Sequence, residues 1–145
     1  MHISDEVKQK VELYNKHAAK SMGDVLGIEF LSFEKGKVTG SMPVNTSTSQ
    51  PFGILHGGAS VAFAETLASV GGWLALDDYE SYIIVGLEIN ANHIRSVRKG
   101  KVNGKATALH VGKKTQVWEI RIEDEENNLV CISRCTLAIL PRKIG

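Results

Sequence analysis

The stretch HGGASVAFAETLASVGGWLAL, residues 56–76, decides the fold of this chain. It has the length of a helix of several turns, and it is apolar on nearly every side. A helix of this kind cannot lie on an open surface, so the rest of the chain must wrap around it. The stretch carries a single charged side chain, Glu65. Burying a carboxylate without a partner is costly, so this residue requires an explanation.

The composition describes a globular protein and excludes several classes of partner. A chain of 145 residues fits one domain, residues 1–145, and 43% apolar with 23% charged residues is close to the globular average. The net charge of +1 comes from interleaved acids and bases, so no nucleic-acid partner is expected. The N-terminus lacks the apolar core of a secretory signal, which favours a cytoplasmic location. Residues 56–76 are too polar to span a membrane, because they contain Glu65, Thr66 and Ser69.

The two cysteines, Cys131 and Cys135, are expected to be free thiols. They lie four residues apart in a run that predicts a strand, which separates their Cα atoms by about 13 Å, too far for a disulfide. No histidine or further cysteine follows at ligand spacing, so no metal site is predicted.

The pattern around residues 56–76 predicts an α+β architecture. Apolar residues at helical spacing predict an amphipathic helix over 4–22, and alternation over 25–44, split by a turn at 34–37, predicts a hairpin. A loop of turn-forming residues, NTSTSQPFG, follows. Four further strands are predicted over 82–93, 101–111, 115–124 and 129–140. With no strand–helix alternation, we expect an antiparallel sheet wrapped around the long central helix, an N-terminal helix at its flank, and a second subunit covering what remains.

Glu65 and the start of the helix predict a site for chemistry on a carbonyl group. No Lys or Arg lies within one helical turn of Glu65, and carboxylates perturbed in this way concentrate at functional sites. The alternative is a Glu at a wet subunit interface or bonded to backbone. His56-Gly57-Gly58 would leave amide N–H groups open at the positive end of the helix dipole, where an oxyanion is stabilised. The alternative is a glycine pair that only fits a tight turn.

The distance between these two elements requires two copies of the chain. Glu65 lies eight residues after Gly57, about 12 Å along a helix axis, whereas a Glu side chain reaches roughly 4 to 5 Å. If both act on one substrate, Glu65 must come from a second copy whose helix runs antiparallel. A small-residue stripe would allow close contact between helices, although core packing explains it equally well: Ala64, Ala68 and Gly72. Ser69, one turn after Glu65, and Gln50, on the loop, would reach the same place.

The stretch QPFGILHGGASVAFAETLAS, residues 50–69, resembles the central loop and helix of the hotdog-fold acyl-CoA thioesterases. The resemblance is to the branch of PaaI-like and Glu-type 4-hydroxybenzoyl-CoA thioesterases, including the bacterial 1,4-dihydroxy-2-naphthoyl-CoA (menaquinone-pathway) and enterobactin-proofreading enzymes. It continues through three further stretches: EINANHIRSVRKG (88–100), GKKTQVWEI (112–120) and SRCTLAIL (133–140). The resemblance therefore implies a single hotdog thioesterase domain.

The resemblance also implies roles for individual residues. Glu65 would attack the thioester or activate a water, and the Gly57 N–H would polarise the carbonyl. His56 would contact that region, while Gln50 and Ser69 would orient the hydrolytic water. The family places the glutamate and the glycine on opposite subunits, which implies a homodimer, and it further implies a homotetramer. No resident cofactor is expected, because coenzyme A is part of the substrate.

Residues that would contact coenzyme A or the acyl group follow from the same resemblance. The candidate basic residues are Arg95, Arg98, Lys99, Lys113 and Lys114, each of which would otherwise be an ordinary solvated turn charge. Further candidates are Gly58, His93 and Phe52, and the acyl pocket is expected to be walled by Phe52, Met22 and Val70. His93 would otherwise be a core or edge histidine.

Two other functions compete with hydrolysis of an aromatic or medium-chain acyl-CoA. Hotdog dehydratases and hydratases pair a His with an acid, and His56 is present, but the set Gln50, Gly57, Glu65 and Ser69 fits hydrolysis better. A non-catalytic acyl-CoA-binding or regulatory hotdog protein is the third class. The identity of the acyl group, and the choice between nucleophile and general base for Glu65, stay open.

Overall fold

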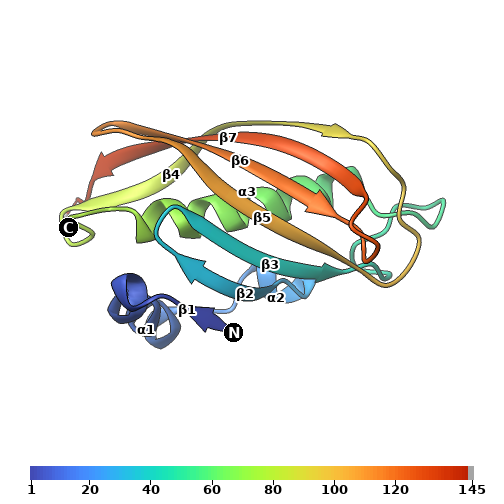
Figure 1. The fold of residues 1–145 in the computed structure, drawn as a ribbon, viewed down its shortest axis with the longest axis horizontal. Coiled ribbons are helices and arrows are strands. Elements are labelled where there is room, and N and C mark those ends of the chain that lie inside the picture. The colour runs from blue at the N-terminus through green and yellow to red at the C-terminus, as the bar shows by residue number, and fades with distance from the viewer. Residues whose placement is uncertain (144–145) are drawn as a thin grey trace.

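The computed structural model describes residues 1–143 and shows one sheet curved around one long helix (Figure 1). The elements in chain order are β1 (His2–Ile3), η1 (Asp5–Val7), α1 (Lys8–His17), α2 (Met22–Leu26), β2 (Glu29–Glu34), β3 (Lys37–Pro43), α3 (Gly57–Leu74), β4 (Tyr82–His93), β5 (Lys101–Val111), β6 (Thr115–Glu123) and β7 (Leu129–Pro141).

The sheet has seven strands in the order β1-β2-β3-β5-β6-β7-β4. All neighbouring strands pair antiparallel except the short β1, which pairs parallel with β2. Helix α3 runs along the concave face, and α1 lies below its C-terminal end (Figure 1). The predicted architecture is confirmed: an antiparallel sheet wraps around a long central helix, with an N-terminal helix at its flank.

The core fills the space between α3 and the sheet. Phe63 and Leu67 of α3 are fully buried, and they pack against Gly40 of β3 and Gly104 of β5, which are cross-strand partners. A Cβ added to Gly104 would stand 2.7 Å from Leu67 and 2.8 Å from Phe63, so the helix approaches the sheet this closely only because side chains are absent there. The predicted inward face of β6, Trp118 with Ile120 and Ile122, is fully buried.

The predicted strands agree with the structure to within a few residues, whereas the N-terminal segment differs. The helix predicted over 4–22 begins with a 3-10 turn and ends at His17. A separate short helix, α2, follows, because Ser21 and Asp24 form a capping box and Gly27 ends the helix with a φ of 72°. The five-residue α2 and the two-residue β1 are too short to leave a periodic pattern.

Helix α3 turns one face to the sheet and leaves another partly open. Ala64, Ala68 and Gly72 are all buried against the chain's own core, so the interpretation of this stripe as a helix–helix contact is wrong, and core packing explains it. The partly exposed residues of α3 form a different stripe, called here the open stripe: Val61, Ala62, Glu65, Thr66, Ser69, Val70 and Trp73. Part of this stripe is covered within the same copy, since the Trp73 ring lies 6.3 Å from the Tyr14 ring of α1, centroid to centroid. The part that carries Glu65 stays partly exposed and could contact a second copy.

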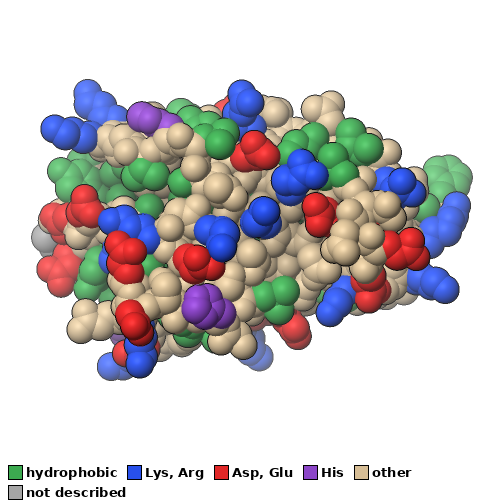
Figure 2. All heavy atoms as spheres, in the orientation of Figure 1, with side chains coloured by type: hydrophobic (Ala, Val, Ile, Leu, Met, Phe, Trp, Pro, Cys, Tyr) green, Lys and Arg blue, Asp and Glu red, His purple; other side chains and the backbone are tan. Residues whose placement is uncertain are grey.

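The sheet ends in a strand with an open edge. Strand β4 pairs with β7 on one side, and it carries exposed apolar side chains, including Val85 and Leu87. The face shown in Figure 2 has Lys, Arg, Asp and Glu side chains intermixed, without a large area of one charge. Across the part of the chain that the structure describes, no helix has the length and hydropathy needed to cross a membrane.

Candidate active site

The start of α3 presents one unpaired backbone amide. His56 is the N-cap residue, and its Nδ1 accepts a hydrogen bond of 2.8 Å from the Gly58 N–H, while its carbonyl accepts from Ala59 and Ser60. The Gly57 N–H makes no hydrogen bond to any atom of residues 1–143. It lies at the positive end of the dipole of an 18-residue helix. The two predicted glycines therefore differ: the Gly58 N–H donates to the N-cap side chain, whereas the Gly57 N–H has no acceptor among residues 1–143.

A pocket of about 250 Å³ lies at the start of α3, and Gly57 is one of its lining residues. Its lining includes Gln50, Gly57, Ser60, His93 and Arg95, so four of the predicted site residues meet there. The loop that carries Gln50 is closed by hydrogen bonds: the Gln50 N–H donates to the Ile54 carbonyl over 2.9 Å, and its Oε1 accepts from the Phe52 N–H. These contacts fix the loop beside the helix start.

Glu65 lies two turns further along α3, on the open stripe, and is partly buried rather than enclosed. Its side chain packs against Gly86 of β4, where an added Cβ would overlap Oε1 and stand 3.2 Å from Cδ. Within residues 1–143 the carboxylate makes no hydrogen bond and no ion pair. The charge of Glu65 also affects the thiol of Cys135. Burial, and then the charges of Glu65 and Glu88, raise the pKa of that thiol to about 12.

One copy of the chain does not bring Glu65 and Gly57 together. Helix α3 is unbroken between them, which keeps the separation near the expected 12 Å, and Glu65 does not line the pocket at the helix start. Ser69 follows Glu65 by one turn on the same open stripe.

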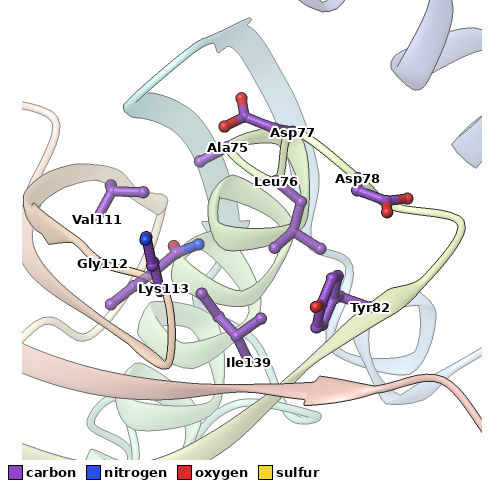
Figure 3. Close-up of a pocket in the computed structure, with 10 residues that line it drawn as sticks. Ala75, Leu76, Asp77, Asp78, Tyr82, Val111, Gly112, Lys113 and Ile139 are labelled. Carbon is purple, nitrogen blue, oxygen red and sulfur yellow. The ribbon is translucent and has the colours of Figure 1, made fainter.

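The predicted basic residues fall into two groups at opposite ends of α3. Arg95 lines the pocket at the helix start, and Arg98 donates to the Phe52 carbonyl over 3.5 Å; Lys99 follows it. Lys113 lines a different pocket of about 380 Å³ beyond the C-terminal end of the helix, with Lys114 next to it in the β5–β6 turn. Figure 3 shows Lys113 there with Leu76, Tyr82 and Ile139.

The residues expected to wall an acyl pocket do not enclose one in a single copy. Phe52 is 85% exposed and Met22 61% exposed, while Val70 lies partly buried on the open stripe.

The two cysteines are buried, and both are free thiols, as predicted. Among the described residues, no cluster of His, Cys, Asp or Glu side chains is arranged to hold a metal ion.

Sequence reasoning missed Gly86, the residue against which Glu65 packs. The available signal was a glycine within a run of β-branched and apolar residues, which often marks a bulge or a close approach. The pairing of β4 with β7 does shift between Gly86 and Glu88.

An antiparallel sheet wrapped around one long central helix is the arrangement of the hotdog fold. Comparison with known proteins agrees: residues 52–131 match the model of the thioesterase superfamily. The chain belongs to this superfamily and is a thioester hydrolase.

Individual relatives cover most of the chain. It is 49% identical over 120 residues to 1,4-dihydroxy-2-naphthoyl-CoA hydrolase of Listeria monocytogenes, covering 83% of this chain and 96% of the relative. It is 44% identical over 126 residues to the proofreading thioesterase EntH of Klebsiella pneumoniae, covering 87% and 90%. Among solved structures, a thioesterase from Haemophilus influenzae superposes with a TM-score of 0.82 at 48% identity, covering 90% of each chain.

Proposed function

We propose that the protein hydrolyses an acyl-CoA thioester with an aromatic or medium-chain acyl group, releasing the free acid and coenzyme A. The observation that carries the proposal is the Gly57 N–H, which lacks an acceptor within residues 1–143 and belongs to a residue that lines a pocket with Gln50 and His93. A thioester carbonyl placed there would accept this hydrogen bond. The bond and the helix dipole would strengthen as negative charge develops on the oxygen.

Glu65 would supply the second half of the chemistry. As a nucleophile, its carboxylate oxygen would bond to the carbonyl carbon while the C–S bond breaks, leaving a mixed anhydride that water then hydrolyses. As a general base, it would take a proton from a water that attacks the same carbon. In both routes coenzyme A leaves as the thiolate and takes up a proton. Ser69 and Gln50 would orient the water in either route.

The proposed site is shared between two copies of the chain. Glu65 and Gly57 are about 12 Å apart along one helix, beyond the reach of a Glu side chain. Two α3 helices packed antiparallel through their open stripes would bring each Glu65 to the Gly57 of the other copy. The exposed apolar edge of β4 would extend the same contact, since an unpaired edge strand is a template for pairing. The homotetramer implied by the resemblance stays a prediction.

The basic residues near the helix start are proposed to hold the phosphates of coenzyme A. Arg95 and Arg98 flank the loop that carries Gln50, and Lys99 follows in the same turn. Lys113 and Lys114 would reach the same coenzyme A only from another copy.

For the acyl group we propose an aromatic group such as a naphthoyl or benzoyl group. The relative named 1,4-dihydroxy-2-naphthoyl-CoA hydrolase, at 49% identity, supports this proposal.

The test is thiol release measured across aromatic and aliphatic acyl-CoAs for the wild type and Glu65→Gln, with Glu12→Gln, an exposed residue of α1, as the matched control. We expect Glu65→Gln to lower kcat by about 10³-fold or more with the fold intact, and the control to be unchanged. Near-normal turnover by Glu65→Gln would remove this residue from the mechanism. Binding of acyl-CoA without thiol release by the wild type would favour the non-catalytic alternative.

A further inference from the structure

Gly86 lies in the middle of β4, where the pairing of this strand is interrupted. Gly86 is paired with Leu137 of β7 and Glu88 with Thr136, so Leu87 is an extra residue between two successive pairs. This is a β-bulge, a feature that bends a strand and changes the direction of neighbouring groups, and bulges are frequent beside active sites. Leu87 is exposed, so the extra residue is accommodated on the outer side of the edge strand.

The missing side chain of Gly86 makes room for the Glu65 side chain. The three nearest heavy atoms to a Cβ built on Gly86 are all in the Glu65 side chain: Oε1, which the Cβ would overlap, Cδ at 3.2 Å and Cγ at 3.9 Å. Other glycines of the sheet differ in this respect. A Cβ on Gly104 would meet the core side chains Leu67 and Phe63, and one on Gly40 would also meet the Glu29 carbonyl oxygen at 2.7 Å.

Within one copy, the Glu65 carboxylate is oriented by its packing against Gly86. It has no hydrogen-bond donor and no cation among residues 1–143, so the flat surface of the β4 backbone at Gly86 sets its position. Cys135 of β7 lies near enough for its thiol to respond to the charges of Glu65 and Glu88. The carboxylate therefore lies against β4 at Gly86 instead of extending freely from the helix.

We propose that Gly86 is a positioning residue for the reaction: its Cα holds the Glu65 carboxylate against β4, on the open stripe of α3, in the orientation that hydrolysis requires. The inference rests on the proposed function, in which Glu65 acts on the thioester. A Cβ at position 86 would push the tip of a flexible side chain aside at little cost to the fold. Misplacing a catalytic group by about 1 Å is nevertheless enough to lower a rate by about 10²-fold.

The experiment compares Gly86→Ala with the wild type in kcat, KM, thermal stability and molar mass. We expect kcat to fall about 10²-fold, KM to stay within about 3-fold, Tm to change by only a few degrees, and the molar mass to be unchanged. Gly23→Ala is the matched control, because a Cβ on Gly23 would meet nothing closer than 3.5 Å, and it should keep full activity.

A second background separates positioning from a general effect on the strand. In Glu65→Asp the carboxylate is one methylene shorter and withdrawn from Gly86, so adding Gly86→Ala should lower the residual kcat by less than about 3-fold. If Gly86→Ala fails to fold, Glu65→Ala should restore folding by removing the clashing atoms, and failure to do so overturns the inference.

The results distinguish this inference from the proposal on which it rests. Normal turnover by Glu65→Gln overturns the proposed function itself. An inactive Glu65→Gln together with a fully active Gly86→Ala overturns only the role of Gly86. The role is also overturned if Gly86→Ala loses activity together with its dimer mass, or loses the same factor in the Glu65→Asp background.

Discussion

The imidazole ring of His93 packs on the Cα of Gly57, so that a Cβ at position 57 would stand 2.8 Å from Nε2 and 3.1 Å from Cε1. His93 is the last residue of β4, and Gly57 is the first residue of α3. Strand β4 therefore contacts α3 at two places, and a glycine takes part in each contact. His93 of β4 packs on Gly57 of α3, and Gly86 of β4 packs against Glu65 of α3. One edge strand lines both halves of the proposed chemistry.

The backbone at Gly57 allows its N–H to be tested separately from its missing side chain. Gly57 is the first helical residue, where proline is tolerated, and His56 before it has the extended φ of -69° and ψ of 129° that proline requires. Gly57→Ala keeps the N–H and adds a Cβ, whereas Gly57→Pro also removes the N–H. In the His93→Ala background, which removes the clash, we expect Gly57→Pro to have a kcat about 10²-fold below that of Gly57→Ala.

Steady-state kinetics and circular dichroism check this prediction, with His93→Ala alone as the reference. Equal kcat values for the alanine and proline variants would show that the N–H does not stabilise charge in the transition state. A proline variant with reduced helix content would have to be compared at lower temperature before its kcat is interpreted.

Mixing two inactive variants tests whether the site is shared. Glu65→Ala keeps the helix-start amide and Gly57→Pro keeps the carboxylate, so a mixed dimer has one intact site and one site that lacks both groups. Random exchange places half of the subunits in mixed dimers, which predicts recovery of about a quarter of wild-type activity. Native mass spectrometry verifies the exchange, and thiol release measures the recovery. No recovery in a mixture shown to contain mixed dimers would contradict the shared site.

Most of the fold could be predicted because its signals are local. Alternation along each strand and turn residues between strands fix the elements from β2 to β7 to within a few residues, as the buried Trp118, Ile120 and Ile122 illustrate. Helix α2 and β1 depend on a capping box and a short parallel pairing, which leave no periodic pattern. Helical spacing shows that Ala64 and Ala68 share a face, but not which body that face contacts.

The candidate site also combines features that are local in the sequence with contacts between distant segments. Gly57 and Glu65 lie within one segment, so the helical rise predicts their separation, although their roles stay proposals. Contacts between segments could not be predicted: the packing of Gly86 on Glu65 depends on the register of a bulged edge strand. The separation of Lys113 from Arg95 likewise follows from the path of the sheet, because turns that look alike in sequence lie at opposite ends of α3.

Lys10 of α1 should stabilise the fold by capping the C-terminal end of α3. Its Nζ donates to the Leu74 carbonyl over 2.8 Å and also to the Leu76 carbonyl, and it lies 5.6 Å from the centre of the Tyr79 ring. A cation is favourable at this end of the helix dipole. We expect Lys10→Met to lower the free energy of unfolding by about 1–2 kcal/mol, and Lys16→Met, an exposed change on the same helix, by less than about 0.5 kcal/mol. Urea unfolding followed by circular dichroism measures both, and equal values would show that the cap adds nothing.

The Cys135 thiol gives the fold a dependence on alkaline pH. Burial, with the charges of Glu65 and Glu88, raises its pKa from an ordinary value of 9.0 to about 12, so the folded state holds the proton more tightly than the unfolded chain. The resulting stabilisation is fully present below about pH 9 and is lost as the pH rises towards 12.

The wild type should therefore lose more stability than Cys135→Ala between pH 8 and pH 10. We expect the difference to be about 1 kcal/mol or less in the free energy of unfolding. The comparison with Cys135→Ala cancels the titration of lysines and tyrosines that both proteins share.

Iodoacetamide should also leave the native wild type unmodified at pH 8 and label it only after unfolding, because Cys131 and Cys135 are both fully buried. Equal pH slopes in the two proteins, or rapid labelling of the native wild type, would contradict a thiol kept protonated in the core beneath Glu65.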